Sequence, residues 1–324
     1  MHNGLGEKSP FLRRISVDIK HLKYFLAIAN SPSLSAASQY IGVAQPSLSQ
    51  HVKRMEEELG VKLLERSPRG TVLTEEGFVL VEHAKRICAD LDRCVQDMRD
   101  LSGTVRGTVS FGMPPSASMV MSVALAETVR LELPEVRLKV VEAISGYITP
   151  WLKDGTVDLG IIYDLENAEQ YDVIHVLNER LYFISAPDAW PFDTPPGDPV
   201  KFKDLAKLDM ILPSNGLRKT IQKYEDQIGI ALNVVIEMDA MRQIMELVAR
   251  GSGYAIFAPA ATHHFERRGE LVRAPIIDPI LTRPVHLVNH PERVLTRAGR
   301  TVKALTLQIA QEMVRRGIWE GDIV

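Results

Sequence analysis

The polar side chains between residues 45 and 54 carry the clearest chemical signal in this sequence. In QPSLSQHVKR, the spacing of Gln45, Ser49 and Lys53 places them on one face of a helix. The apolar residues recur at helical spacing on a second face and are Leu48, Val52, Met55 and Leu59. Amides, hydroxyls and a lysine on an exposed helix face can hydrogen-bond to base edges and phosphates. The pattern therefore predicts a helix that packs inward on one side and binds nucleic acid on the other.

Two shorter helices precede this segment and would position it. Apolar spacing predicts one helix from Asp18 to Asn30 and another from Ser33 to Ile41, followed by a turn at Gly42. The third helix begins near Gln45, and Pro46 suits its first turn. This layout is typical of a helix-turn-helix, whose second element lies in the major groove. A plain three-helix scaffold with a polar outer face is the alternative.

A basic hairpin is expected directly after these helices. Val61–Glu65 and Thr71–Leu73 have the composition of short strands, and Ser67–Gly70 forms a turn signal between them. Arg66 and Arg69 would lie near the tip of this hairpin. Arginine suits the narrow, negative minor groove, so the hairpin is predicted to be a DNA-contacting wing. A surface hairpin whose arginines are merely solvated is the alternative.

A long helix with a coiled-coil pattern follows Thr74, which is a suitable N-cap. Its apolar residues alternate in steps of four and three for about three heptads. The seam consists of Leu80, Ala84, Ile87, Leu91, Cys94, Met98 and Leu101. Such a seam needs a partner helix, which predicts a homodimer through this segment. An ordinary helix lying on its own domain is the alternative.

The pattern changes to alternating strand-like and helical segments from Gly107 onward. Strands that alternate with helices of this length predict an α/β fold with a largely parallel sheet. This part of the chain is long enough for two lobes, at about 100–200 residues per domain. The proline-rich run at residues 187–202 predicts a surface loop within it.

Composition places the chain among ordinary globular proteins, because 45% of its 324 residues are hydrophobic and 24% are charged. A formal net charge of −3 excludes a bulk binder of polyanions. The first 74 residues hold ten Lys and Arg against six Asp and Glu, so they carry +4 and the remainder carries −7. A basic N-terminal part before an acidic body indicates a nucleic-acid-binding end.

The sequence lacks the signatures of several other classes of protein. Cys88 and Cys94 have no metal-ligand spacing and suit a reducing cytoplasm, and we expect neither a metal nor a cofactor. No apolar run is long enough to predict a membrane span. Residues 1–17 lack the apolar core of a signal peptide, and we expect a flexible tail there. Phosphate-loop, dinucleotide, serine-hydrolase and zinc-protease motifs are missing, so we do not expect an enzyme.

Taken in order, these segments resemble the LysR-type bacterial transcriptional regulators from about Ile19 to Gly317. The motifs that carry the resemblance are FLAIANSPSLSAASQYIGVAQPSLSQHVKRMEEELGVKLLER, RGTVLTEEG, RGTVSFG, LPEV and GTVDLGIIYD. The winged-helix part is highly specific in order and spacing, and the body matches more loosely. Within the family the chain resembles the regulators of nitrogen assimilation and aromatic catabolism.

The resemblance implies a winged helix-turn-helix, a linker helix, and an effector domain of two lobes like those of periplasmic binding proteins. On this sequence these parts would be residues 18–74, 75–104 and 105–324. The lobes would comprise residues 105–168 with 268–317, and residues 169–267. The resemblance also implies a cytoplasmic homotetramer, built as a dimer of dimers, that binds promoter DNA and a small metabolite.

DNA-contacting positions follow from the resemblance together with the polar helix face. They are Ser33, Gln45, Pro46, Ser47, Ser49, Gln50, Lys53 and Arg54, with Arg66 and Arg69 on the wing. Ala44 stands where the family often has Ser or Thr. This difference removes a helix cap worth about 1 kcal/mol.

Family members hold their effector between the two lobes, and the matching positions here follow strand ends. They are Ser116, Ala117, Ser118 and Met119 on one wall, Pro213, Ser214, Asn215 and Gly216 on the other, and Ser145, Gly146 and Phe257. Helix N-termini at two of these places would favour a carboxylate, so we expect a small anionic organic effector. Plain N-capping by Ser116 or Ser118 is the alternative for the first wall.

A second function remains open, namely a small-molecule solute-binding protein without a DNA role. The winged segment and the lack of a signal-peptide pattern argue against it. Binding to DNA that weakens steeply with salt would distinguish the two functions.

Overall fold

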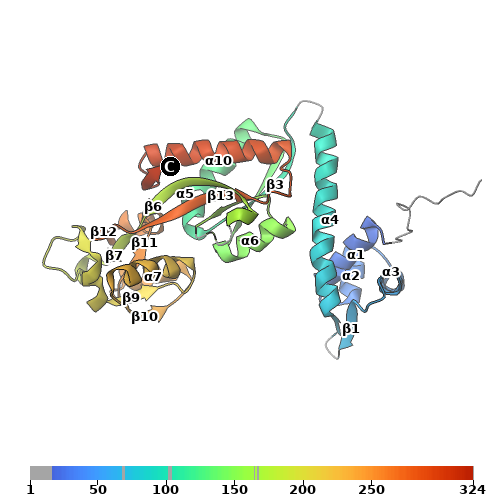
Figure 1. Ribbon diagram of the computed structural model, residues 1–324, viewed down its shortest axis with the longest axis horizontal. Helices are drawn as coiled ribbons and strands as arrows, with labels where there is room; N and C mark the ends of the chain where they lie inside the picture. Colours follow the sequence, from blue (N-terminus) through green and yellow to red (C-terminus); the bar gives the residue numbers. More distant parts are fainter. Residues whose placement is uncertain (1–16, 68–69, 101–103, 164, 166–167, 324) are drawn as a thin grey trace, which may run out of the picture. The chain divides into compact units, whose positions relative to one another are not determined.

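The computed structural model describes residues 17–67, 70–100, 104–163, 165 and 168–323 (Figure 1). The chain divides into two compact units, residues 1–95 and residues 96–324. The predicted tail at residues 1–17 lies almost wholly outside the described residues. None of the helices in the described part of the chain is both long and apolar enough to span a bilayer.

Three helices begin the first unit, and their ends follow local sequence signals. They are α1 (Ile19–Ala29), α2 (Leu34–Ile41) and α3 (Gln45–Leu59). Asp18 caps α1 by accepting from the backbone N–H of His21, and Ser33 caps α2 by accepting from that of Ala36. Gly42 ends α2 with a φ of 74°. The predicted helices are confirmed to within a residue or two because caps and apolar spacing are local properties.

Helix α3 buries three of its four predicted apolar positions, and those three are Leu48, Val52 and Met55. Leu59 is the exception, because its side chain is 43% exposed. It occupies the last turn before Gly60, where the other helices of the unit leave it uncovered. At the opposite end, Ala44 provides no side-chain cap, because an alanine side chain cannot accept a hydrogen bond.

The hairpin consists of β1 (Leu64–Ser67) and β2 (Gly70–Leu73), which pair antiparallel from Leu64 and Leu73. It begins three residues later than predicted, because Glu56 holds the preceding segment. The Glu56 carboxylate accepts from the backbone N–H groups of Leu63 and Leu64 at 3.0 and 3.4 Å and from the Lys62 ammonium at 2.8 Å. These contacts fix the chain between α3 and the hairpin.

Helix α4 (Glu75–Asp100) begins against the same segment. The Thr74 hydroxyl accepts from the backbone N–H of Gly77 at 2.9 Å and donates to the carbonyl of Lys62 at 2.7 Å. A Cβ added to Gly77 would lie 2.2 Å from the Leu63 carbonyl oxygen. Only glycine allows the first turn of α4 to approach the hairpin this closely.

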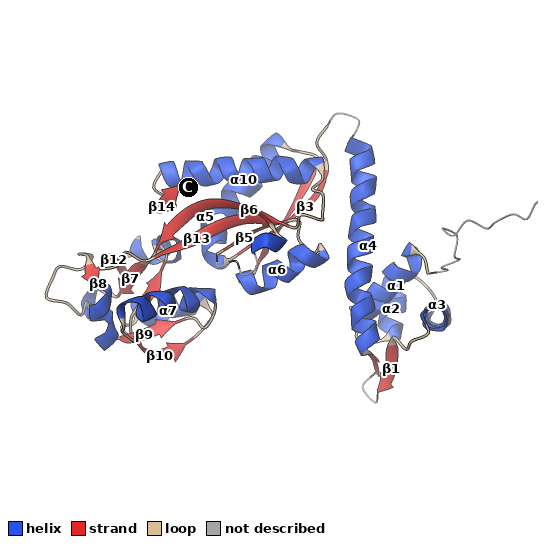
Figure 2. Ribbon diagram, in the orientation of Figure 1, coloured by secondary structure: helices blue, strands red, loops and turns tan. Residues whose placement is uncertain are grey.

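The second unit contains two groups of strands (Figure 2). Its larger sheet has six strands within the described residues, in the order β14-β6-β13-β5-β3-β4. Their bounds are β3 (Gly107–Met113), β4 (Val136–Glu142), β5 (Leu159–Ile162), β6 (Asp172–Arg180), β13 (Thr282–Asn289) and β14 (Gly321–Ile323). The associated helices are α5 (Pro115–Glu132), α6 (Ser145–Asp154) and α10 (Arg297–Arg315).

Alternate residues of this sheet face two separate cores. Leu159 and Ile161 of β5 belong to the core formed with α5 and α10, whereas Ile162 packs with Ile148 of α6. Helix α6 therefore covers the opposite face from α5 and α10. It approaches closely at Gly160, where an added Cβ would lie 2.6 Å from the Ile148 side chain. This close packing positions the start of α6 beside the strand ends.

The other lobe has its own apolar core around shorter strands. Strands β11 (Ala255–Phe257), β7 (Tyr182–Ser185), β12 (Val272–Ile277) and β8 (Val200–Lys201) form one sheet, and β9 (Asp209–Leu212) pairs with β10 (Asn233–Glu237). Its helices are α7 (Gly216–Ile228), α8 (Met241–Ala249) and α9 (His263–Glu266). The predicted loop at residues 187–202 contains only short 3₁₀ turns and β8.

Two expectations about this unit are wrong. The sheets are mixed and not largely parallel, because β13 and β6 pair antiparallel with each other and with their outer neighbours. The lobe boundaries at residues 169 and 268 are too early, because β6 belongs to the larger sheet and β12 to the smaller one. The chain crosses between β6 and β7, and again between β12 and β13, without an intervening helix. Because no helix separates these strands, the sequence pattern gave no sign that the chain passes from one lobe to the other at either crossing.

The Glu56 contacts predict a pH-dependent stability of the first unit. Burial raises the pKa of Glu56, but hydrogen bonds from Lys62 and from the Leu63 and Leu64 backbone outweigh it and lower the pKa below 4.5 overall. Its contribution is therefore present above pH 4.5 and is lost as the pH falls further. Glu56→Gln should lower the free energy of unfolding by about 1–3 kcal/mol at pH 7 and by progressively less as the pH falls below 4.5.

Hydrogen exchange of the Leu63 and Leu64 amides, followed against pH, would measure this effect. Glu57→Gln is the matched control, since the Glu57 side chain is 64% exposed and forms an exposed ion pair with Lys53 at 3.7 Å. Equal effects of the two substitutions would show that Glu56 does not hold the hairpin.

Candidate functional site

The polar face of α3 is accessible as the sequence predicts. Its exposed members are Gln45, Pro46, Ser49, Gln50, Lys53 and Arg54, while Ser47 is half-buried. The Gln45 side-chain oxygen accepts from the Ser35 hydroxyl at 3.2 Å, and Lys53 lies 3.7 Å from Glu57. Both contacts are between exposed side chains and are easily exchanged for contacts to DNA. The N-terminus of α3 has no side-chain cap, so its first N–H groups can meet a phosphate.

Of the three remaining predicted DNA-contacting residues, the structure describes the side chain of Ser33 alone. Ser33 is half-buried, and its hydroxyl already serves as the N-cap of α2. The backbone of Arg66 belongs to β1, but its side chain lies outside the described part of the structure. Arg69 is also outside the described residues.

The predicted seam of α4 separates into two sets of residues. Ala84 is fully buried in the core of its own unit, with Leu80 packed against that core, so Ala84 offers no surface to a partner. This part of the seam prediction is wrong because the first turns of α4 complete the winged-helix core. Ile87, Leu91, Cys94 and Met98 are exposed, and Leu101 lies outside the described residues.

A cavity of about 360 Å³ lies in the second unit where residues of both lobes meet. Eight of the predicted effector residues line it, namely Ser116, Ser145, Gly146, Pro213, Ser214, Asn215, Gly216 and Phe257. The starts of α5, α6 and α7 all contribute to its wall, since these helices follow strand ends.

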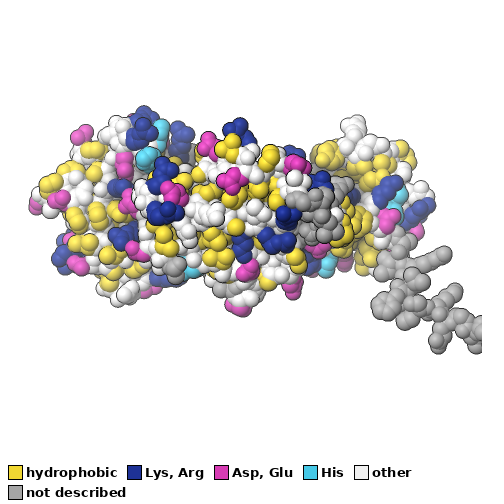
Figure 3. Space-filling view, turned by 90° about the horizontal axis from the view of Figure 1, so that it is seen from above, with side chains coloured by type: hydrophobic (Ala, Val, Ile, Leu, Met, Phe, Trp, Pro, Cys, Tyr) yellow, Lys and Arg dark blue, Asp and Glu magenta, His cyan; other side chains and the backbone are white. Residues whose placement is uncertain are grey.

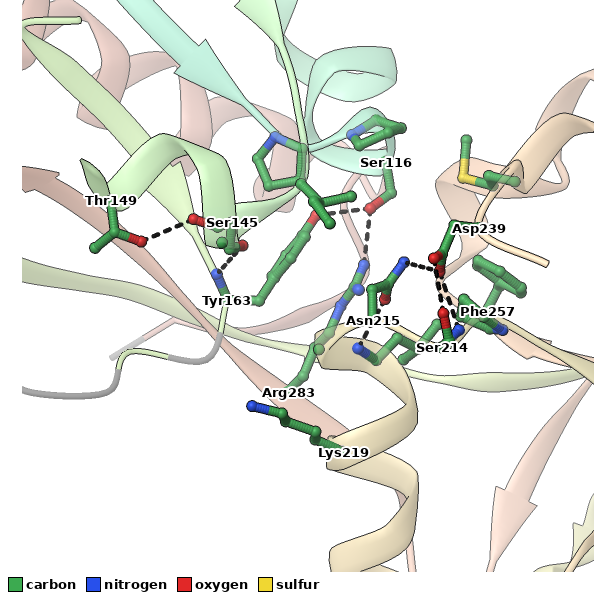
Figure 4. A pocket seen from close by; sticks show the side chains of 18 of the residues that line it. Ser116, Ser145, Thr149, Tyr163, Ser214, Asn215, Lys219, Asp239, Phe257 and Arg283 are labelled. Atoms are coloured by element: carbon green, nitrogen blue, oxygen red, sulfur yellow. Dashed lines mark hydrogen bonds between the residues drawn. The ribbon is translucent and has the colours of Figure 1, made fainter. Parts of the chain in front are cut away.

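A buried polar network closes the cavity on the side of the larger sheet (Figure 4). The Arg283 guanidinium contacts Glu179 at 2.5 Å and donates to the Ser116 hydroxyl at 2.8 Å. The Ser116 hydroxyl lies 2.7 Å from that of Tyr163. The Trp319 indole N–H donates to the second oxygen of Glu179 at 2.8 Å. Arg283 also stacks over the Tyr163 ring at 3.6 Å from its centroid.

The surroundings of this network set the charge states of Tyr163 and Arg283. Burial raises the pKa of Tyr163 and keeps its phenol neutral. Burial lowers the pKa of Arg283, but the adjacent Glu179 outweighs it and raises the pKa overall, so the guanidinium stays charged. Ser116 and Tyr163 share one hydrogen bond between two hydroxyl groups. Whichever of them donates, the O–H of the other remains available to a ligand.

The opposite wall presents the start of α7. The Asn215 side chain caps this helix by accepting from the backbone N–H of Leu217 at 3.1 Å. The Asp239 carboxylate, from the segment before α8, accepts from the backbone N–H and hydroxyl of Ser214 and from the Asn215 amide. Figure 4 shows Asp239 directed toward Ser214 and Asn215 at the edge of the cavity. The exposed Lys219 also lines this wall.

Comparison with known proteins identifies both units. A family model described as "LysR substrate binding domain" matches residues 102–311, and one described as "Bacterial regulatory helix-turn-helix protein, lysR family" matches residues 19–78. The chain belongs to the LysR family of bacterial transcriptional regulators. It is a DNA-binding regulator with an effector-binding domain, and the alternative of a solute-binding protein without a DNA role is not supported.

Individual relatives cover most of the chain. The HTH-type transcriptional regulator BbuR of Bordetella bronchiseptica is 27% identical over 307 residues, which are 94% of each chain. BenM of Acinetobacter baylyi is 24% identical over 275 residues, which cover 84% of this chain and 89% of that one. The solved structure of full-length CbnR with its target DNA has a TM-score of 0.67 at 21% identity, and covers 93% of this chain and 99% of that chain. This last likeness shows the fold.

Three predicted effector positions of this LysR-family chain do not line the cavity. Ala117 and Ser118 are buried on the inner side of α5, and Met119 is 49% exposed. The reason is that α5 already begins at Pro115, so that only Ser116 of this group reaches the cavity from the first turn. Plain N-capping by Ser116 or Ser118 is also excluded, because α5 has no side-chain cap from its N-cap residue, Pro114.

Sequence reasoning missed the charged and aromatic members of the wall. The lining residues not predicted include Tyr163, Asp239, Arg283, Thr149, Lys219 and Met241. Arg283 could have been noticed as a charged residue near the start of an apolar strand, and Glu179 as a charged residue near the end of another strand. The two are direct cross-strand partners of β13 and β6, a register that the sequence does not specify.

The Arg283–Glu179 pair predicts a large and specific stability effect. Arg283→Met would leave Glu179 buried without a counter-charge and should lower the free energy of unfolding by about 3–5 kcal/mol. The double substitution Arg283→Met with Glu179→Gln removes both charges and should recover much of this loss. Urea unfolding followed by tryptophan fluorescence would measure it, because Trp319 contacts Glu179.

Lys201→Met serves as the control for this series. Lys201 forms an exposed ion pair with Asp278 at 3.8 Å and should change stability by less than about 1 kcal/mol. A loss at Arg283 no larger than that at Lys201 would contradict the assigned role of the buried pair.

Proposed function

We propose that this regulator binds promoter DNA as a dimer of dimers in the cytoplasm, and that a small metabolite bearing a carboxylate controls it from the cavity between the lobes. The observation that supports DNA binding through α3 is its exposed row of amide, hydroxyl and basic side chains. Gln45 and Ser49 would contact base edges, while Lys53 and Arg54 would contact phosphates. The uncapped start of α3 would bind a further phosphate.

Dimerisation is proposed through the exposed apolar residues of α4. Ile87, Leu91 and Met98 are 44, 39 and 63% exposed, at spacings that suit contact with a second helix. Val95 adds a further exposed apolar side chain to this segment at 40%. We infer that these residues, with Leu101, pack against the same helix of a second protomer. A homotetramer would then require another contact between copies.

The carboxylate of the effector is proposed to bind on the side of the larger sheet. The free hydroxyl donor of Ser116 or Tyr163 lies on this wall beside the charged Arg283. The start of α6 adds the N–H groups of Ser145 and Gly146. Hydrogen bonds from neutral groups and a helix N-terminus are a typical environment for a carboxylate. The start of α7 is less suited, because Asp239 already accepts from its donors.

Such a ligand would couple the cavity to the arrangement of the lobes. The lobes are joined by two direct strand crossings, and ligand contacts to both walls would favour one spacing between them. A ligand can shift this equilibrium only by its difference in affinity for the two arrangements. We propose that this shift is what alters the DNA complex.

The DNA-binding proposal predicts the effect of substitutions on α3. Gln45→Ala and Ser49→Ala should each weaken binding to the specific site by about 1–3 kcal/mol and reduce discrimination between sequences. Gel shifts with the DNA upstream of the coding sequence, compared with scrambled DNA at several salt concentrations, would measure both quantities. Gln227→Ala is a control, since Gln227 is exposed on α7 in the other unit. Unchanged discrimination in the α3 variants would exclude this face as the reader of sequence.

The dimer proposal predicts a change of mass. Leu91→Asp places a charge in the apolar contact and should dissociate the dimer at micromolar concentration, as measured by light scattering. Val235→Asp is the control, because Val235 is also an exposed apolar residue, at 48%, but lies on β10. A dimer retained by Leu91→Asp would place the interface elsewhere.

A further inference from the structure

The cavity contains a carboxylate of its own on the wall formed by the smaller lobe. Asp239 is exposed and lines the cavity together with Ser214 and Asn215. Its Oδ1 accepts from the Ser214 backbone N–H at 3.0 Å and from the Asn215 amide at 3.1 Å. Its Oδ2 accepts from the Ser214 hydroxyl at 2.7 Å. The carboxylate is therefore held in one orientation by three donors.

These contacts change what the start of α7 can bind. A helix N-terminus normally favours an anion, and here Asp239 occupies that role. A second carboxylate at the same place would meet a like charge and would find the Ser214 and Asn215 donors already used. An ionised carboxylate has about four acceptor positions, and the three contacts leave one of them on Oδ2. This wall therefore offers an acceptor with a negative charge.

The wall on the side of the larger sheet offers hydrogen-bond donors, because the buried network ends there in the Ser116 and Tyr163 hydroxyl groups. One hydroxyl of the Ser116–Tyr163 pair can donate to a ligand, and Arg283 lies beside it in the lining of the cavity. The charge of Arg283 is balanced by Glu179, and the exposed Lys219 adds a second cation to the lining of the cavity. With Glu179 included, the formal charges around the cavity sum to zero, and the oriented acceptor Asp239 lies on the wall opposite the Ser116 and Tyr163 hydroxyls. A ligand with two negative ends does not match this arrangement.

We propose that the effector is an amino-acid-like zwitterion, with a carboxylate bound at Ser116 and Tyr163 and an ammonium group bound at Asp239. This inference rests on the proposed function of the cavity as the effector site. The apolar side chains of Ile144, Leu165, Met241 and Phe257 also line the cavity, so the body of the ligand is apolar. An ammonium group supplies the donor and the positive charge that the remaining acceptor position of Asp239 favours. Asp239 is thereby the residue that determines specificity for the amino group.

Five six-carbon compounds test this proposal by isothermal titration calorimetry on the full chain. Leucine and 6-aminohexanoate carry both charged groups, at adjacent and at opposite positions. Hexanoate and 4-methylpentanoate keep the same skeletons without the amine, and adipate replaces the amine with a second carboxylate. At least one amino compound should bind about tenfold to a hundredfold more tightly than its amine-free counterpart, and adipate should bind most weakly.

Asp239→Asn separates the charge of this residue from its shape. This substitution keeps one oxygen acceptor and should abolish most of the preference for the amino compound, while binding of the amine-free acid changes little. Asp204→Asn is the matched control, because it makes the same change of net charge at an exposed position of the same lobe outside the cavity. It should leave the preference intact.

The outcomes distinguish this inference from the proposed function. Binding of hexanoate, 4-methylpentanoate or adipate as tightly as the amino compounds would overturn the zwitterion and leave the cavity as a carboxylate site. A preference for the amine that survives Asp239→Asn would overturn the role of Asp239. No binding of any of the five compounds would count against both proposals. Loss of the preference in Asp239→Asn alone would support the inference.

Discussion

The buried ion pair between Arg283 and Glu179 is the interaction on which the effector-binding unit depends. The two residues are direct cross-strand partners, and both strands continue at once into the crossings between the lobes. A buried charge is tolerated only when it is paired and its remaining hydrogen bonds are satisfied. Trp319 satisfies Glu179 from the C-terminal segment, and Ser116 accepts from Arg283 at the start of α5. One charge pair thus joins two central strands, a helix start and the end of the chain.

The same pair connects the cavity with the two strand crossings between the lobes. Ser116, Tyr163 and Arg283 all line the cavity, and Arg283 lies at the start of the strand that follows the second crossing. A ligand that accepted from Ser116 or Tyr163 would therefore contact groups at the base of both crossings. A further polar chain continues past Trp319, where Glu320 accepts from the Tyr182 hydroxyl at 2.7 Å and pairs with Arg273 at 2.7 Å. Tyr182 and Arg273 belong to β7 and β12 of the smaller lobe. The C-terminal segment therefore contacts both lobes near their junction.

Local features of the fold could be predicted from the sequence, and those fixed by distant partners could not. Asp18, Ser33 and Gly42 mark helix ends through their own residue types, so the DNA-binding helices were located closely. The helix starts at Ser116, Ser145 and Asn215 reach the cavity because they follow strand ends, which is also a local signal. Tyr163, Asp239 and Arg283 were missed because only the three-dimensional arrangement brings them to the same cavity. Ala84 was misplaced because spacing identifies an apolar stripe but not what covers it.

The net negative charge of the effector-binding unit is not gathered on one face of it. Basic and acidic side chains are interspersed on the face of the effector-binding unit in Figure 3, without a single acidic field. The recognition proposed for this chain depends instead on the positions of a few side chains, such as Asp239 in the cavity and the exposed polar residues of α3. Helix α4 serves two separate purposes along its length. Leu80 and Ala84 complete the core of the first unit, whereas Ile87 and Leu91 remain exposed. Because one continuous helix carries both sets of residues, any pairing through Leu91 would also fix where the α3 helices of the two protomers lie relative to each other.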